Sequence, residues 1–154
     1  MKRKNFLKAL GLATLVLFTA TVRAADAGTP AEAEALVKKV VAYMKANGAE
    51  KAFDEVTNGK SFKDRDLYAY IYDLNGKCLA HGANVKLVGK DLIGLKDPDG
   101  KLVIKIVMDL AKEKGKGWTE PVKFRNPTTD KLQTRVSYIE RFGDYVIGSG
   151  VYKD

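Results

Sequence analysis

The sequence is poor in the residues that build most metal centres. Its 154 residues include one cysteine, Cys78, and one histidine, His81. A lone cysteine forms no disulfide within the chain, and a zinc site needs three or four cysteine, histidine or carboxylate ligands. In an unbroken strand, residues 78 and 81 would also point to opposite faces, because their spacing is odd. We therefore expect no metal, no cofactor, and a buried, inert Cys78.

Catalytic motifs are also absent from the sequence. It contains no Cys-x-x-Cys pair, no haem-attachment motif and no glycine-rich phosphate loop. The serines Ser61, Ser137 and Ser149 stand in no nucleophile-elbow pattern. A hydrolytic triad would have to recruit His81, and a lone histidine more often has a structural role. The sequence predicts a protein that is not an enzyme.

Long apolar runs are limited to one stretch near the start. The run ALGLATLVLFTATV follows the basic segment MKRKNFLK and precedes small residues. This layout is typical of a secretory signal peptide, whereas a membrane-spanning helix needs about 20 apolar residues. We expect a signal peptide at residues 1–24, cleaved after Ala24 or Ala27, and one periplasmic domain at residues 25–154. An uncleaved membrane anchor is the alternative.

Net positive charge is concentrated in that first segment. The whole chain carries +8, but residues 1–24 hold five of the 27 basic residues and none of the 19 acidic ones. The remainder therefore carries only +3, with lysines spread along its length. Nucleic-acid binding needs a clustered basic face, so we expect no nucleic-acid partner.

The pattern of apolar residues predicts an α+β domain. Thr29, Pro30 and Glu32 form a capping signal for a long helix, and Asn75-Gly76 is typical of a tight hairpin. In the segment LYAYIYD, Tyr68, Tyr70 and Tyr72 alternate with apolar residues, as in a strand. The expected elements are helices at 30–47, 49–59 and 101–115, and strands at 67–73, 77–81, 117–124, 131–142 and 145–153.

Aromatic and cationic residues in the second half suit a small carboxylate. Arginine binds a carboxylate through two parallel hydrogen bonds, and aromatic walls exclude water. Arg135 lies between apolar neighbours in a predicted strand, where a buried and unpaired charge is costly. An exposed position on that strand is the alternative. Arg135 and Tyr138 are also an odd number of residues apart, so an unbroken strand would place them on opposite faces.

The pattern resembles the small single-Cache domains, which are PAS-like extracytoplasmic sensor modules of chemoreceptors and histidine kinases. The resemblance rests on DLYAYIYDLNGKCLAHGANVKLVGKDL, GKGWTEPVKF, TRVSYIERF and the closing YVIGSGVY. It implies a long N-terminal helix packed on a five- to six-stranded antiparallel sheet, and a pocket for a small organic acid such as acetate, propionate, pyruvate or lactate. The ligand-binding residues that it implies are Tyr68, Tyr70, His81, Trp118, Arg135 and Tyr138.

Two functions follow from these expectations. The first is a periplasmic sensor-type domain in signal transduction or chemotaxis. With no signalling domain expected after Asp154, such a domain would either pass its signal to a partner, such as a membrane receptor or histidine kinase, or act only as a binding protein. The alternative is an interaction module without a small ligand, which docks through its N-terminal helix. That alternative, like a homodimer through the same helix, predicts an exposed apolar stripe at Val37, Val41 and Met44.

Overall fold

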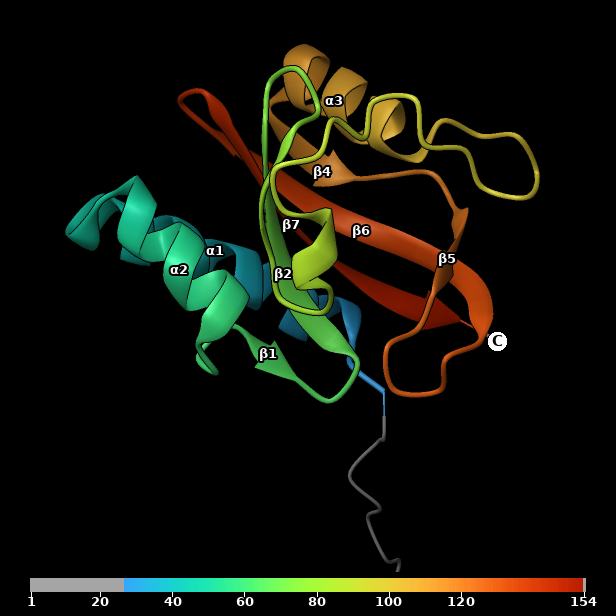
Figure 1. The fold of residues 1–154 in the computed structure, drawn as a ribbon, viewed down its shortest axis with the longest axis horizontal. Coiled ribbons are helices and arrows are strands. Elements are labelled where there is room, and N and C mark those ends of the chain that lie inside the picture. The colour runs from blue at the N-terminus through green and yellow to red at the C-terminus, as the bar shows by residue number, and fades with distance from the viewer. Residues whose placement is uncertain (1–26, 154) are drawn as a thin grey trace, which may run out of the picture.

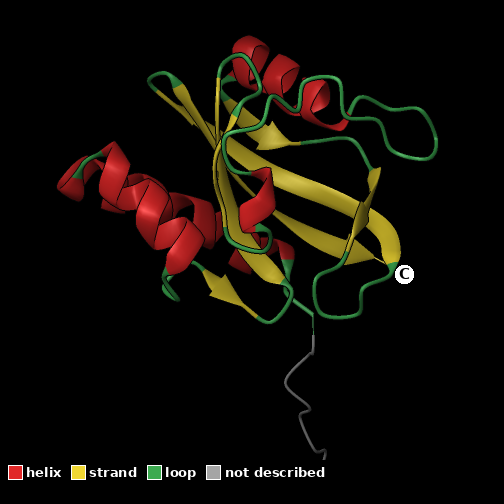
Figure 2. Cartoon of the chain, viewed as in Figure 1, coloured by secondary structure: helices red, strands yellow, loops and turns green. Residues whose placement is uncertain are grey.

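The computed structural model describes residues 27–153, so the predicted signal peptide at 1–24 lies outside the described part. A seven-stranded antiparallel sheet lies at its centre, with helices on both faces (Figures 1 and 2). The elements are α1 Pro30–Asn47, α2 Ala49–Asn58, β1 Lys63–Asp64, β2 Leu67–Asp73, β3 Cys78–His81, the 3-10 turn η1 Val85–Leu87, α3 Val103–Lys114, β4 Lys116–Trp118, β5 Val122–Arg125, β6 Leu132–Phe142 and β7 Tyr145–Lys153.

The sheet has β2, β7 and β6 at its centre. β2 pairs with β7 on one side and with β1 and β3 on the other. β6 pairs with β7 over nine residue pairs and carries both β4 and β5 on its outer edge. The predicted α+β class and the long N-terminal helix are confirmed, and the two additional strands are short.

Helix α1 covers one face of the sheet. Its N-terminus has the predicted capping box between Thr29 and Glu32. Its apolar stripe, including Val37, Val41 and Met44, is buried against the sheet. The exposed stripe required by the docking and homodimer alternatives is therefore absent. Among residues 27–153, no helix is both long and apolar enough to cross a bilayer.

The two faces of β2 belong to different cores. Ala69 and Ile71 pack with α1 and α2. Tyr68, Tyr70 and Tyr72 pack on the opposite face with α3 and the long connection between β3 and α3. This connection is the extended green segment beside α3 in Figure 2. The alternation predicted from LYAYIYD thus separates a helix-covered face from a second face that carries aromatic side chains.

Two strands depart from the sequence prediction. The strand expected at 117–124 is divided into β4 and β5, because Pro121 has no amide hydrogen to donate to a ladder. In β3, the pairing shifts so that His81 pairs with Tyr70 but Cys78 pairs with Tyr72, which leaves Leu79 as a bulge residue. Cys78 and His81 therefore share the tyrosine face, and the expectation of opposite faces is wrong.

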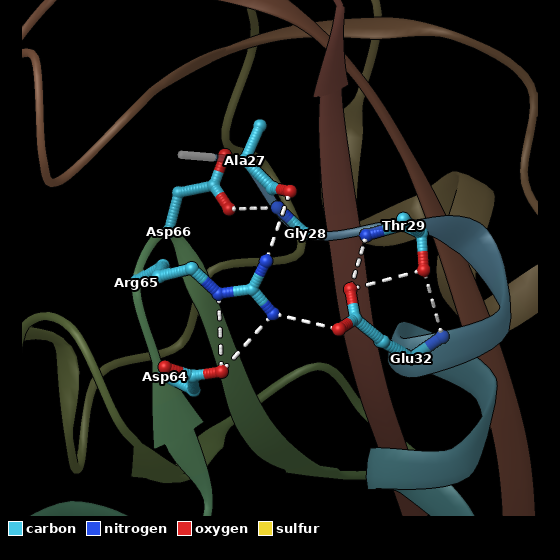
Figure 3. A network of polar contacts seen from close by, with 7 residues as sticks. All are labelled: Ala27, Gly28, Thr29, Glu32, Asp64, Arg65 and Asp66. Carbon is cyan, nitrogen blue, oxygen red and sulfur yellow. Dashed lines mark hydrogen bonds and ion pairs between the residues drawn. The ribbon is translucent and has the colours of Figure 1, made fainter. Parts of the chain in front are cut away.

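A polar network fixes the start of α1 to the turn between β1 and β2 (Figure 3). Arg65 donates from Nη1 to the carbonyl oxygen of Ala27 at 3.1 Å and from Nη2 to Glu32 Oε1 at 2.8 Å. The buried carboxylate of Asp66 accepts from the amide of Gly28 at 2.7 Å. The entry to the domain is thus joined to the turn that leads into β2.

Candidate ligand-binding site

The centre of the tyrosine face is occupied by the guanidinium of Arg135. This side chain is only 4% exposed. Its Cζ lies 4.8 Å from the ring centroid of Tyr68, 5.2 Å from those of Tyr70 and Phe124, and 5.5 Å from that of Tyr152. All four distances are within the range of a cation–π interaction. Rings from β2, β5 and β7 thus surround a cation that β6 supplies.

Two glycines of β7 make room for this arrangement. A Cβ built on Gly150 would overlap Nε of Arg135 and would lie 2.6 Å from Oγ of Ser137. A Cβ built on Gly148 would overlap the hydroxyl end of Tyr70. The guanidinium and the tyrosine ring therefore lie across the backbone of β7, where a side chain would otherwise stand.

The Arg135 guanidinium has unused hydrogen-bond donors. Its Nε and Nη2 atoms are buried and have no hydrogen-bond partner among the described residues. No salt bridge to Arg135 occurs there either. Because arginine remains protonated in proteins, this is a buried cation without an anion. Such a group is costly in the absence of a counter-charge.

His81 supplies a third unused donor on the same face. Its Nδ1 accepts hydrogen bonds from the amides of Ala83 at 3.3 Å and Asn84 at 3.0 Å, which places the ring proton on Nε2. Nε2 is buried and has no partner. Burial, together with the charge of Arg135, lowers the pKa of His81 to about 3. The ring is therefore neutral at physiological pH and offers one N–H.

The tyrosine hydroxyls form a chain away from these donors. Tyr152 Oη donates to the carbonyl oxygen of Arg125 at 2.8 Å and lies 3.0 Å from Tyr68 Oη. Because the only hydroxyl hydrogen of Tyr152 is used, Tyr68 is the donor in the second bond. Burial raises the pKa of Tyr68, so this hydroxyl stays protonated. Tyr68 thus presents its ring and an acceptor oxygen to the site.

A pocket of about 510 Å³ opens beside this cluster, between the long connection and the β5–β6 hairpin. Tyr68 and His81 form part of its lining. Arg135 instead lines a separate, much smaller space of about 10 Å³ together with Tyr70. The remaining residues of the large pocket are Ala83, Asn84, Leu87, Leu95, Lys96, Asp97, Pro98, Val103, Lys123, Phe124, Arg125, Pro127, Asp130 and Leu132.

Val103 and Phe124 line both spaces and therefore form the partition between them. The inner void has room for about one water. A carboxylate would reach the guanidinium only if Phe124 or a neighbouring ring moved. We regard the two spaces as one site because they share this partition, and because the Tyr68 ring contacts both His81 and Arg135.

The two walls of the large pocket are fixed to each other by Asp97. Its Oδ2 accepts from the amide of Lys123 in β5 at 2.9 Å, and its Oδ1 accepts from the amide of Lys101 at 2.9 Å. The side chain itself is buried. A turn in the long connection is thereby attached to the strand across the pocket.

Two of the expected ligand-binding residues lie elsewhere. Tyr138 packs among the α1-facing residues, and Trp118 contacts it edge-on with ring centroids 5.7 Å apart. The β6–β7 register is regular between Arg135 and Tyr138, so their odd spacing puts them on opposite faces. Trp118 pairs directly with Tyr138 and shares its face. The structure thus brings together Tyr68, Tyr70, His81 and Arg135, but not Trp118 or Tyr138.

Several residues of the site were missing from the sequence prediction. Phe124 and Tyr152 complete the aromatic enclosure, and both stand opposite or near Arg135 in the strand pairing. Even spacing within the last strand indicates that Gly148, Gly150 and Tyr152 share one face. That spacing could have identified Tyr152 and the two glycines as neighbours of the site.

Comparison with known protein families identifies the class of protein. The profile of the family described as Single Cache domain 2 matches residues 2–154. The chain therefore belongs to this family of ligand-binding sensory modules.

Two curated proteins are similar in sequence. The chain is 39% identical over 95 residues to the methyl-accepting chemotaxis protein McpP of Pseudomonas putida, covering 59% of this chain and 17% of that protein. It is 29% identical over 92 residues to the sensor histidine kinase MctS of Rhizobium johnstonii, covering 58% and 20%. The matched region thus spans a fifth or less of the length of these curated relatives.

A solved structure confirms the fold. A Cache chemosensory domain, described in a study of carboxylic acid recognition, has a TM-score of 0.67 and 26% identity to this chain. The similarity covers 80% of this chain and 92% of that one.

Proposed function

We propose that this protein is a periplasmic sensor-type domain that binds a small organic carboxylate and acts in signal transduction or chemotaxis. The observation that carries the proposal is the set of unpartnered donors on one face. Arg135 contributes two buried donor nitrogens, Nε and Nη2, and His81 contributes one, Nε2. An ionised carboxylate only accepts hydrogen bonds, so it complements this set.

The charge balance supports an anion over a neutral acceptor. Arg135 is a buried cation with four aromatic rings around it and no acidic side chain paired with it among the described residues. A ligand carboxylate would supply both the missing negative charge and a planar pair of oxygens that fits a guanidinium. The neutral His81 would add directional hydrogen bonding without additional charge.

The role in signalling rests on the relatives. One relative is a chemotaxis receptor, another is a sensor histidine kinase, and a structural neighbour is described by its recognition of carboxylic acids. We infer that the present domain reports its ligand to a receptor or kinase of this type. The ligand-free docking module loses support, because its defining stripe at Val37, Val41 and Met44 is buried.

A calorimetric titration tests the proposal. Acetate, propionate, pyruvate and lactate are each titrated into the purified protein and into Arg135→Lys. Lysine keeps the charge but lacks the planar fork, so we expect affinity to fall at least tenfold in the variant. Arg141→Lys is the matched control, since Arg141 is on the same strand but exposed. Equal affinity in Arg135→Lys and the parent would exclude Arg135 from the site, and no heat with any acid would exclude the function.

A further inference from the structure

The large pocket extends well beyond what a two- or three-carbon acid needs. Its volume is about 510 Å³. A volume of this size is within the range of about 300–1,000 Å³ typical of pockets for much larger small molecules. A short acid held by His81 would leave most of this space filled with water.

The walls of that extra space are predominantly apolar. Leu132 is 52% exposed at the outer end, although large apolar side chains gain free energy when they are covered. Hydrated apolar walls favour a ligand with an apolar body, because its binding would remove both surfaces from water. The apolar lining residues are Leu87, Leu95, Pro98, Val103, Phe124, Pro127 and Leu132.

The outer part of the pocket has no buried site for a second anion, since Lys96 in its lining is exposed to water. Lys123 Nζ donates to Thr134 Oγ1 at 2.7 Å, and Arg125 Nη1 lies 3.0 Å from a carboxylate oxygen of Asp130. Among the described residues, the buried side-chain nitrogens without partners belong only to His81 and Arg135. The buried unused donors are therefore gathered at the inner end, where a single head group would bind.

We propose that the pocket takes a monocarboxylate with an apolar body longer than three carbons. The head group meets the donor of His81 and, once Phe124 or a neighbouring ring has moved, those of Arg135, and the body lies along the apolar walls toward Leu132. The inference rests on the proposed function, since it assumes a carboxylate at the inner donors. It adds the shape and the single charge of the ligand.

A homologous series of acids tests this assignment. Acetate, propionate, butyrate, hexanoate and octanoate are titrated into the purified protein by calorimetry at one pH and salt concentration. Each buried methylene contributes about 0.8 kcal/mol, which corresponds to roughly a fourfold gain in affinity. Hexanoate is therefore expected to bind about 50-fold more tightly than propionate. Affinity that peaks at acetate or propionate would overturn the inference and leave the proposed function standing.

Two further ligands examine the head group and the single charge. 1-Hexanol has the apolar body without the carboxylate, so we expect no detectable binding; hexanol binding as tightly as hexanoate would overturn the assignment. Adipate carries a second carboxylate, which would lie along apolar walls without a buried unpartnered donor. Adipate is expected to bind at least tenfold more weakly than hexanoate, and tighter binding would contradict the single head group. If no acid of any length binds, both the inference and the proposed function fail.

A pair of surface variants locates the apolar body. Leu132→Gln makes the outer wall polar without adding charge. It should weaken octanoate severalfold while changing acetate less than twofold. Val85→Gln is the control, because Val85 is 61% exposed but is not part of the pocket lining. Equal effects of the two variants on octanoate would show that the body does not lie against Leu132.

Discussion

Replacing Arg135 with methionine distinguishes the contribution of Arg135 to folding stability from its contribution to ligand binding. Methionine approximates the length and apolar stem of arginine without its charge or its N–H groups. We expect Arg135→Met to leave the ligand-free protein as stable as the parent, or up to about 2 kcal/mol more stable. The same variant should lose all stabilisation by carboxylates.

Opposing contributions of Arg135 to folding stability set the range expected for Arg135→Met. The two unpartnered donors, Nε and Nη2, each cost about 1–3 kcal/mol when buried, and desolvation of the cation adds to that cost. The four surrounding rings offset part of it, at about 0.5–2 kcal/mol for each cation–π contact. Methionine removes both sets of effects but keeps the apolar contacts, so the net change is neutral or favourable.

Thermal unfolding with and without ligand measures both effects. For a domain of this size, a gain of 1 kcal/mol raises Tm by about 3–5 °C. A ligand at about 100 times its Kd stabilises the parent by roughly 2.7 kcal/mol, and this increment should vanish in the variant. A loss of more than about 2 kcal/mol in the ligand-free variant would show that Arg135 has a structural role, and would refute the reasoning. Retention of the ligand-induced increment would refute it as well.

Three other predictions follow from the site. Gly150→Ala should displace the guanidinium and weaken carboxylate binding at least tenfold, whereas Gly94→Ala, whose Cβ meets nothing within 4 Å, should leave binding unchanged in the same titration. Since the folded-state pKa of His81 is lowered to about 3, the unfolded chain takes up this proton first as pH falls below about 6.5, and stability decreases. The loss attributable to His81 between pH 6.5 and 4.5 is about 2.3 kcal/mol, and urea unfolding of His81→Asn should lack it; an identical pH profile would contradict the assignment. Burial raises the pKa of Cys78 to about 11, so a thiol reagent should label one cysteine in urea and none in the native protein; rapid native labelling would contradict burial.

Local sequence signals predicted most of the fold. The capping box at Thr29 and Glu32, the Asn75-Gly76 turn and the alternation in LYAYIYD each depend on residues close together in the chain. Such signals determine the backbone dihedral angles and the face of the helix or strand on which a side chain lies. Tertiary packing agrees with them here. The boundaries of α1 match the prediction, and those of α3 agree to within two residues.

The site was less predictable, because it depends on register and on contacts across strands. The odd spacing correctly separated Arg135 from Tyr138, but the same rule failed for Cys78 and His81 because of the bulge at Leu79. Nothing in the segment CLAH marks that bulge in advance. The path of the long connection, which supplies Asp97 and much of the pocket wall, is likewise fixed by distant hydrogen bonds and not by local periodicity.

The bulge, the glycines and the unpartnered arginine together determine which donors face the site. The bulge in β3 turns His81 toward the face where Gly150 of β7 leaves space for Arg135 of β6. The unused donors of His81 and Arg135 therefore meet on one side of the sheet. Each of these features weakens the ligand-free fold, since a bulge disrupts a ladder and a buried charge without an anion is costly. A carboxylate would satisfy the donors of β3 and β6 together and remove that cost. The same groups that lower the stability of the empty domain would therefore provide the free energy by which ligand binding stabilises the filled one.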